Sequence, residues 1–233
     1  MPKLYSYVLR YDDGAAPNPY WGICTLAICK PIIRRNADIG DWVIGTGSKN
    51  THLKNKVICD LSDCIVYAMK ITDIMSLKDY DIYCNSSLPN KIPNWYSEQW
   101  PEKMGDCIYD YSYPQTLPNL RLSVHNFENY NRDLSGENVL LSNHFYYFGE
   151  DAKTLPEELR GLIKQNQGHK KIINENLISI FEEWISGFER NKLYADPQLR
   201  YEFDKEMPEE IKNLCARQKH MDDFINENEE ILS

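Results

Sequence analysis

Two side chains near residue 145 have functional groups suited to proton transfer. His144 lies between Asn143 and Phe145, where a strand-like run begins, and Tyr147 follows three residues later. Histidine titrates near neutral pH and a tyrosine hydroxyl can exchange a proton, so both residue types serve as general acids or bases. His125, in a Tyr- and Asn-rich segment, is a further candidate for a general base or for a hydrogen bond to a base edge. Each histidine stands alone, which is equally typical of a structural side chain. We select His144 and Tyr147 as candidate catalytic residues.

The cysteine spacing does not indicate a metal site. Cys24 and Cys29 are five residues apart, as are Cys59 and Cys64, within apolar sequence. Zinc ribbons use two intervening residues, whereas this spacing is more typical of core packing. Seven cysteines are also an odd number for a disulfide framework, so we expect buried thiols in a reducing compartment. We expect no metal, and the sequence identifies no cofactor.

Aromatic and polar side chains gather around two glycine turns, at 12–21 and 45–48. Aromatic rings beside polar turns can stack on a nucleobase, and glycines permit the positive φ with which backbone N–H groups bind an anion. The same rings can fill a small β core, and the second turn is also typical of an ordinary strand-to-loop connection. The candidate ligand-binding residues are Asp12, Asn18, Tyr20, Trp21, Lys30, Arg34, Trp42, Gly45, Thr46, Gly47 and Ser48.

The charge distribution disfavours binding in the groove of a duplex. The 233 residues carry 26 basic and 35 acidic side chains, for a net charge of −9, and only the first 60 residues are net basic. Duplex binding needs clustered Lys and Arg, so most of this chain would repel a polyanion. We expect a nucleotide, a single extruded base or a protein as partner. The sequence has no apolar run of ~18–20 residues and no signal peptide, so we expect a cytoplasmic protein without membrane association.

The predicted secondary structure changes along the chain. Strand-like runs separated by polar turns occupy the first 150 residues, at 4–11, 25–29, 42–44, 65–71, 139–141 and 145–148, and 56–59 is either a further short strand or a loop. The segment 84–136 has little periodicity, and long segments of that kind are usually functional.

From Pro156 the pattern becomes helical. An amphipathic helix is expected from about Ile172 to Phe188, and a last helix from about Pro208. We therefore predict an α+β fold, with a β-rich domain at 1–150 and a helical extension at 151–233 packed on it.

Several motifs in one order resemble a known family. The match is dense over residues 4–75 and returns near 138–149. It rests on Tyr11-Asp12-Asp13-Gly14, Ala16-Pro17-Asn18-Pro19, Gly22 with Cys24-Thr25-Leu26-Ala27 and Cys29-Lys30-Pro31, Ile33-Arg34, Gly40-Asp41-Trp42-Val43-Ile44-Gly45-Thr46-Gly47-Ser48, 66–72 and 141–149. These motifs resemble the nucleotide modification associated domain family, type two. That resemblance implies a setting in phage and bacterial systems that make or handle modified DNA bases.

A looser resemblance concerns the fold. A Gly-Asp turn at 40–41, a strand, a polar loop and the run Ile65-Val66-Tyr67-Ala68-Met69-Lys70-Ile71-Thr72 are similar to the middle of PUA-like barrels, including the EVE and ASCH groups. The resemblance implies a small curved, mainly antiparallel sheet or a PUA-like barrel with C-terminal helices packed on it. Such barrels hold a modified or flipped base in a pocket beside their loops.

The leading functional hypothesis is recognition or processing of a modified nucleobase or nucleotide in a DNA-modification or phage-defence system. Whether the base is read or chemically altered stays open, because the common enzyme signatures are absent. The expected roles are hydrogen bonding for Asp12, Asn18 and Ser48, stacking for Trp42 or Tyr20, and phosphate contact for Lys30 or Arg34. The alternative is a non-catalytic interaction module whose acidic C-terminal helices, at 156–233, dock onto a modification or defence enzyme.

Overall fold

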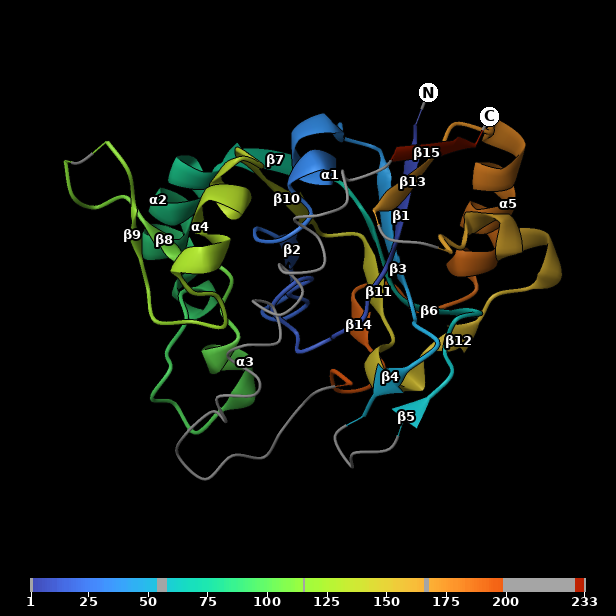
Figure 1. The fold of residues 1–233 in the computed structure, drawn as a ribbon, viewed down its shortest axis with the longest axis horizontal. Coiled ribbons are helices and arrows are strands. Elements are labelled where there is room, and N and C mark those ends of the chain that lie inside the picture. The colour runs from blue at the N-terminus through green and yellow to red at the C-terminus, as the bar shows by residue number, and fades with distance from the viewer. Residues whose placement is uncertain (1, 54–57, 115, 166–167, 199–228, 233) are drawn as a thin grey trace.

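A computed structural model describes residues 2–53, 58–114, 116–165, 168–198 and 229–232 (Figure 1). Its centre is an eight-stranded sheet with the order β14-β11-β6-β3-β1-β13-β15, and β12 also pairs with β6. The strands are β1 (Leu4–Val8), β3 (Trp42–Thr46), β6 (Cys64–Lys70), β11 (Phe145–Tyr147), β12 (Lys153–Thr154), β13 (His169–Ile172), β14 (Lys192–Leu193) and β15 (Glu229–Leu232). The pairs β1–β3, β11–β14 and β13–β15 are parallel, and the other pairs are antiparallel.

A second, three-stranded antiparallel sheet lies beside the first. It has the order β2 (Cys24–Leu26), β10 (Asn138–Ser142) and β7 (Asp73–Ser76). Two short connections join the sheets, one from β6 to β7 and the other from β10 to β11. Short hairpins pair β4 (Thr51–His52) with β5 (Ile58–Cys59) and β8 (Tyr109–Asp110) with β9 (Asn119–Leu120).

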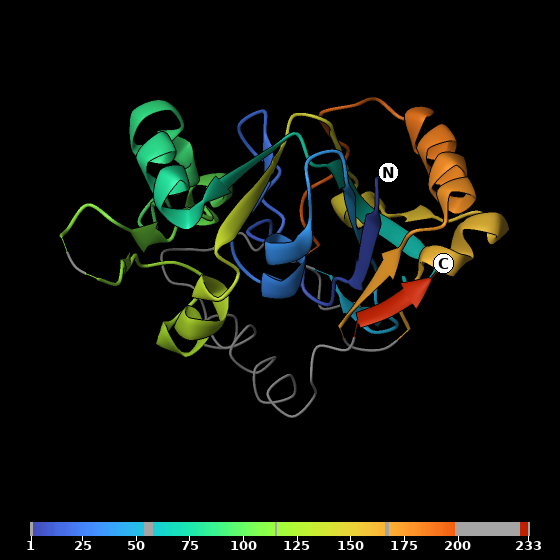
Figure 2. The same cartoon turned by 90° about the horizontal axis from the view of Figure 1, so that it is seen from above.

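The helices lie on opposite sides of the large sheet, α5 on one side and α1, α2 and α4 on the other (Figures 1 and 2). They are α1 (Pro31–Asn36), α2 (Leu77–Ser87), α3 (Trp100–Lys103), α4 (Phe127–Leu134) and α5 (Glu175–Ser186). Three 3-10 turns accompany them, η1 (Pro89–Lys91), η2 (Gly149–Asp151) and η3 (Glu157–Leu162). None of the helices within the described ranges combines the length and the apolar character needed to cross a bilayer.

Local sequence explains where the main helices begin. The Ser76 hydroxyl accepts a hydrogen bond from the Asp79 N–H at 3.0 Å, and the Asn174 side chain accepts one from the Leu177 N–H at 2.9 Å. Both side chains satisfy an N–H group that a helix leaves unpaired at its start. Residues Ile178, Phe181 and Ile185 of α5 are buried. They share one hydrophobic cluster with residues of the large sheet.

The mixed α+β fold with a mostly antiparallel sheet is confirmed, but a closed barrel is not found among the described strands. The large sheet is open, with β14 and β15 at its two edges. The PUA-like barrel is therefore not confirmed. Two helix boundaries were also wrong: Ile172 ends strand β13 because it pairs with Leu4, and the segment after Pro156 is a 3-10 turn. The helix expected from Pro208 lies outside the described residues.

Candidate active site

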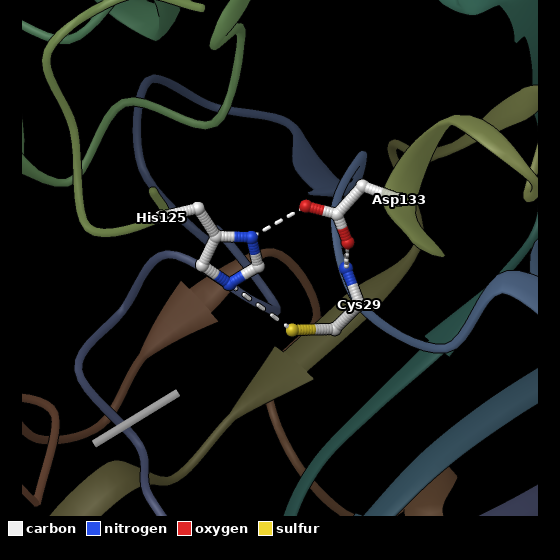
Figure 3. A group of neighbouring side chains, drawn as sticks. All are labelled: Cys29, His125 and Asp133. Atoms are coloured by element: carbon white, nitrogen blue, oxygen red, sulfur yellow. Dashed lines mark hydrogen bonds and ion pairs between the residues drawn. The ribbon is translucent and has the colours of Figure 1, made fainter. Parts of the chain in front are cut away.

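Three side chains from distant parts of the sequence meet in one hydrogen-bonded chain (Figure 3). The Cys29 Sγ lies 3.5 Å from His125 Nε2, and His125 Nδ1 lies 2.5 Å from Asp133 Oδ2. His125 is 4% exposed and Asp133 is 1% exposed, whereas Cys29 is partly accessible. Cys29 is thus the most accessible residue of this cluster.

Cys29 is held in a turn between β2 and α1. Its φ is 60° and that of Lys30 is 42°, so two consecutive non-glycine residues adopt the left-handed conformation. Such a conformation costs roughly 1–2 kcal/mol per residue and persists where surrounding contacts enforce it. Here the Cys29 N–H donates to Asp133 Oδ1 at 2.8 Å, and the Cys29 carbonyl accepts from Arg34 Nε at 2.8 Å. Hydrogen bonds to the N–H and to the carbonyl of Cys29 thus hold the turn in place.

The other two members come from the start and the end of α4. Asn126 caps this helix, accepting from the Glu128 N–H at 2.8 Å, and His125 directly precedes the cap. Asp133 lies in the last turn of the same helix. One short element therefore fixes the spacing between the imidazole and the carboxylate.

The electrostatics favour a charged imidazole and a charged carboxylate. Burial opposes the charged form of His125, but the Asp133 carboxylate and the Cys29 sulfur raise its pKa well above the usual value. Burial also acts to raise the pKa of Asp133, but His125 and Arg34 more than offset it, so the pKa of this carboxyl is lowered. Asp133 Oδ2 also accepts a hydrogen bond from the Tyr109 hydroxyl at 2.9 Å.

This arrangement is suited to nucleophilic catalysis by a thiol. A protonated imidazole facing a sulfur favours the thiolate, which is the reactive form of cysteine. Asp133 holds the His125 ring through Nδ1, so that Nε2 faces the sulfur. Nucleophile, acid–base group and orienting carboxylate are the three parts of a catalytic triad, which is recognised by geometry and not by sequence order.

A metal ion fits the same three residues less well. Their ligand atoms lie within 4.8 Å of one another. However, the Asp133 oxygen nearest the histidine contacts Nδ1, whereas the sulfur faces Nε2. A metal bound by Cys29 and His125 Nε2 would therefore have to compete with the hydrogen bonds of Asp133, to His125 Nδ1 or to the Cys29 N–H, for a third ligand. The geometry favours acid–base chemistry.

A cavity of about 50 Å³ opens beside Cys29 and His125. Its walls come from the end of β1 and the turn that follows it, from residues 28–30, and from α4 with the residues just before it. Pockets for whole drug-sized ligands measure roughly 300–1,000 Å³. This cavity admits one small chemical group next to the thiol.

Of the candidate ligand-binding residues, Lys30 lines this cavity, whereas Arg34 is buried and is not among its lining residues. Arg34 is 0% exposed and donates to three carbonyls, those of Cys29, Asp133 and Asn138. Its side chain ties the nucleophile turn to the end of α4 and the start of β10. In the described contacts Arg34 is a positioning residue for the cluster.

Asp12 and Tyr147 come together in the core. The Tyr147 hydroxyl donates to Asp12 Oδ1 at 2.6 Å, and both side chains are buried. Burial raises the pKa of Asp12 to about 7 and that of Tyr147 well above its usual value.

Trp42 and His144 also meet, but between the large sheet and α5. Their ring centroids are 5.2 Å apart, and Trp42 is 1% exposed. Trp42 Nε1 donates to Glu182 Oε1 at 2.8 Å, and its ring contacts Phe181. Burial lowers the pKa of His144. Neither residue lines the cavity beside Cys29.

The candidates of the two glycine turns are distributed elsewhere. Asn18 is buried, and its side-chain oxygen accepts a hydrogen bond from Lys91 Nζ at 2.7 Å. Tyr20 belongs to a hydrophobic cluster that also contains Leu77, Tyr80 and Cys84 of α2. Trp21, whose φ is 68°, packs against the same cluster.

At the second turn, neither Gly45 nor Gly47 has a positive φ, so the anion-binding turn predicted there lacks its expected conformation. A Cβ at Gly45 would overlap Tyr67, and one at Gly47 would overlap Leu61, so these glycines permit close packing. Thr46 is buried, and Ser48 contacts Thr51.

Sequence reasoning considered Cys29 and His125 separately and missed Asp133. Cys29 and His125 are separated by 96 positions, and no local motif joins them. The signal available in the sequence was the position of Cys29 at the end of an apolar run, directly before Lys30-Pro31, where a strand must turn.

Residues 1–224 match a family described as nucleotide modification associated domain 2. Searches of curated proteins and of solved structures gave no significant match.

Proposed function

The chain belongs to the nucleotide modification associated domain 2 family, and we propose that within this setting it processes a nucleotide by thiol-dependent covalent catalysis at Cys29. The observation that carries this proposal is the hydrogen-bonded chain from the Cys29 sulfur through His125 to Asp133 at the wall of a cavity.

The chemistry follows from the positions of the three groups. The Cys29 thiolate attacks an electrophilic centre of the nucleotide, forming a bond to sulfur while the bond to the leaving group breaks. His125 gives the leaving group a proton from Nε2. Water or a second substrate then loses a proton to the neutral His125, attacks the intermediate and releases the sulfur. Asp133 keeps the ring oriented and stabilises its positive charge in both steps.

We propose that the substrate is a modified nucleotide or a single extruded base, handled in a DNA-modification or phage-defence system. The net charge of −9 supports a small or single-nucleotide substrate over a duplex groove.

The test is the reactivity of Cys29 in the full chain. Iodoacetamide at pH 6.5, with the modified peptides mapped by mass spectrometry, should alkylate Cys29 roughly tenfold faster than the partly buried Cys59. His125→Asn should remove most of this difference, because the imidazolium no longer favours the thiolate. Incubation with a panel of nucleotides should give an adduct mass on Cys29 that is absent in Cys29→Ser. Equal labelling of the two cysteines, without any adduct, would contradict the proposal.

A further inference from the structure

Three cationic side chains from separate parts of the chain line the cavity beside Cys29. Arg10 follows β1, Lys30 precedes α1, and Arg132 lies on α4. All three are half-buried, in a chain where acidic residues outnumber basic ones by 35 to 26. This concentration of positive charge is opposite to the charge of the molecule as a whole.

Two of these charges rest against aromatic rings. The Lys30 Nζ lies 4.6 Å from the centroid of the Tyr7 ring, and the Arg10 Cζ lies 5.9 Å from that of the Tyr11 ring. A cation–π contact orients a cation over the face of an aromatic ring. The Tyr7 and Tyr11 rings thereby help to position Lys30 and Arg10 at the cavity.

Asp13 and Asp133, the two carboxylates among the described residues of the cavity wall, are engaged in local contacts. Asp133 accepts hydrogen bonds from the Cys29 N–H and from Tyr109 and is paired with His125. Asp13 Oδ1 accepts from the Ala15 N–H at 2.9 Å, and burial raises the pKa of Asp13, which works against its negative charge. Among the described residues that line the cavity, basic side chains therefore outnumber carboxylates.

We propose that this cavity binds one phosphate group of the nucleotide, through Arg10, Lys30 and Arg132, and the assignment rests on the proposed function of Cys29. A volume of about 50 Å³ suits a group of phosphate size, whereas a nucleoside would have to remain outside it. Arginine and lysine are the usual phosphate partners. The substrate class is therefore a nucleotide with an accessible phosphate, such as a free mononucleotide.

The experiment compares two alkylating reagents at Cys29 in the full chain. Iodoacetate is an anion and iodoacetamide is its neutral counterpart. The rate of iodoacetate divided by the rate of iodoacetamide therefore reports the electrostatic potential at the sulfur. Arg132→Gln, Arg10→Gln and Lys30→Gln should each lower this ratio roughly threefold or more. Arg160→Gln is the matched control, because Arg160 is exposed, pairs with Glu157 and does not line the cavity. The iodoacetamide rate and the melting temperature identify variants that have lost their fold.

A second arm uses ligands. Inorganic phosphate and nucleoside 5′-monophosphates should protect Cys29 from iodoacetamide, and the corresponding nucleosides should not. A fast iodoacetamide reaction, with no charge dependence and no protection by phosphate, would overturn the phosphate site and leave the proposed function standing. A slow reaction of Cys29 with both reagents, together with phosphate binding by calorimetry that Arg132→Gln abolishes, would support the phosphate site and overturn the thiol function.

Discussion

The Asp133 carboxylate joins the functional and the structural parts of the site. It orients His125, accepts the Cys29 N–H and receives the Tyr109 hydroxyl. Because both charges of the His125–Asp133 pair are buried, removal of either partner leaves the other uncompensated.

Asp133→Asn should therefore lower the free energy of unfolding by about 3–5 kcal/mol at pH 7. It should also lower the pKa of His125, since the carboxylate that raises it is lost. Urea unfolding and the NMR titration of the imidazole measure these effects. Asp38→Asn is the control, because its exposed ion pair with Lys3 should contribute at most about 1 kcal/mol. A variant as stable as Asp38→Asn, with an unchanged imidazole titration, would refute this role.

Stability should depend on pH through the same pair. The raised pKa of His125 means that its contribution is complete below about pH 6.5 and is lost as pH rises through the folded-state value. The lowered pKa of Asp133 means that its contribution is present above about pH 3.9 and is lost as pH falls through the folded-state value. The pair therefore stabilises the fold between these limits.

Asp12 changes stability with pH in the opposite direction to Asp133, because burial raises its pKa in the folded protein. Its folded-state pKa of about 7 exceeds the ordinary value of 3.8, so the folded protein binds the extra proton and loses stability as pH rises between these two values. Asp12→Asn cannot ionise and can still accept from Tyr147, so it should gain stability relative to the wild type between pH 5 and pH 8. Urea midpoints at the two pH values test this, and a constant difference would show that Asp12 does not titrate in this range.

The connection from α4 to β10 is built around the Arg34 guanidinium. Its hydrogen bonds to the carbonyls of Cys29, Asp133 and Asn138 bring three segments together, and Gly136 packs directly on the guanidinium carbon. A side chain at Gly136 has no room unless Arg34 moves.

Gly136→Ala should therefore cost about 1–3 kcal/mol of stability and slow the alkylation of Cys29, because displacement of Arg34 releases the Cys29 turn. Gly161→Ala is the matched control, since its added Cβ would meet only ordinary contacts at 3.6 Å. If both variants lose the same stability and keep the same Cys29 rate, Arg34 does not position the nucleophile.

The whole molecule combines a net charge of −9 with a cavity whose described lining holds more basic than acidic side chains. A mononucleotide can enter the field of the cavity, but a duplex would bring many phosphates against an acidic surface. We expect no duplex binding in a gel-shift assay at physiological salt, under conditions in which a nucleoside monophosphate protects Cys29. A retarded duplex whose binding weakens steeply with salt would contradict this expectation.

Some elements of this fold were readable from the sequence, because alternation, turn residues and caps are local. The β-branched run at 65–71 became β6. Ser76, a residue type that favours helix N-termini, caps α2. The helix expected from Ile172 begins instead at Glu175, because Ile172 pairs with Leu4 across the sheet. That pairing joins residues far apart in the chain, so periodicity alone could not reveal it.

Composition, charge and ordered motifs were enough to indicate the family, a mixed α+β fold and the exclusion of a membrane-crossing helix among the described residues. The candidate site could be identified only from the tertiary structure, which brings its three side chains together. Cys29 resembles a core cysteine, His125 a solitary histidine and Asp133 an ordinary helical carboxylate until the turn after β2 meets α4. Acid–base and nucleophilic chemistry depend on distances of about 3 Å between side chains. Such distances are set by packing between segments about 100 positions apart, which leaves no periodic trace in the sequence.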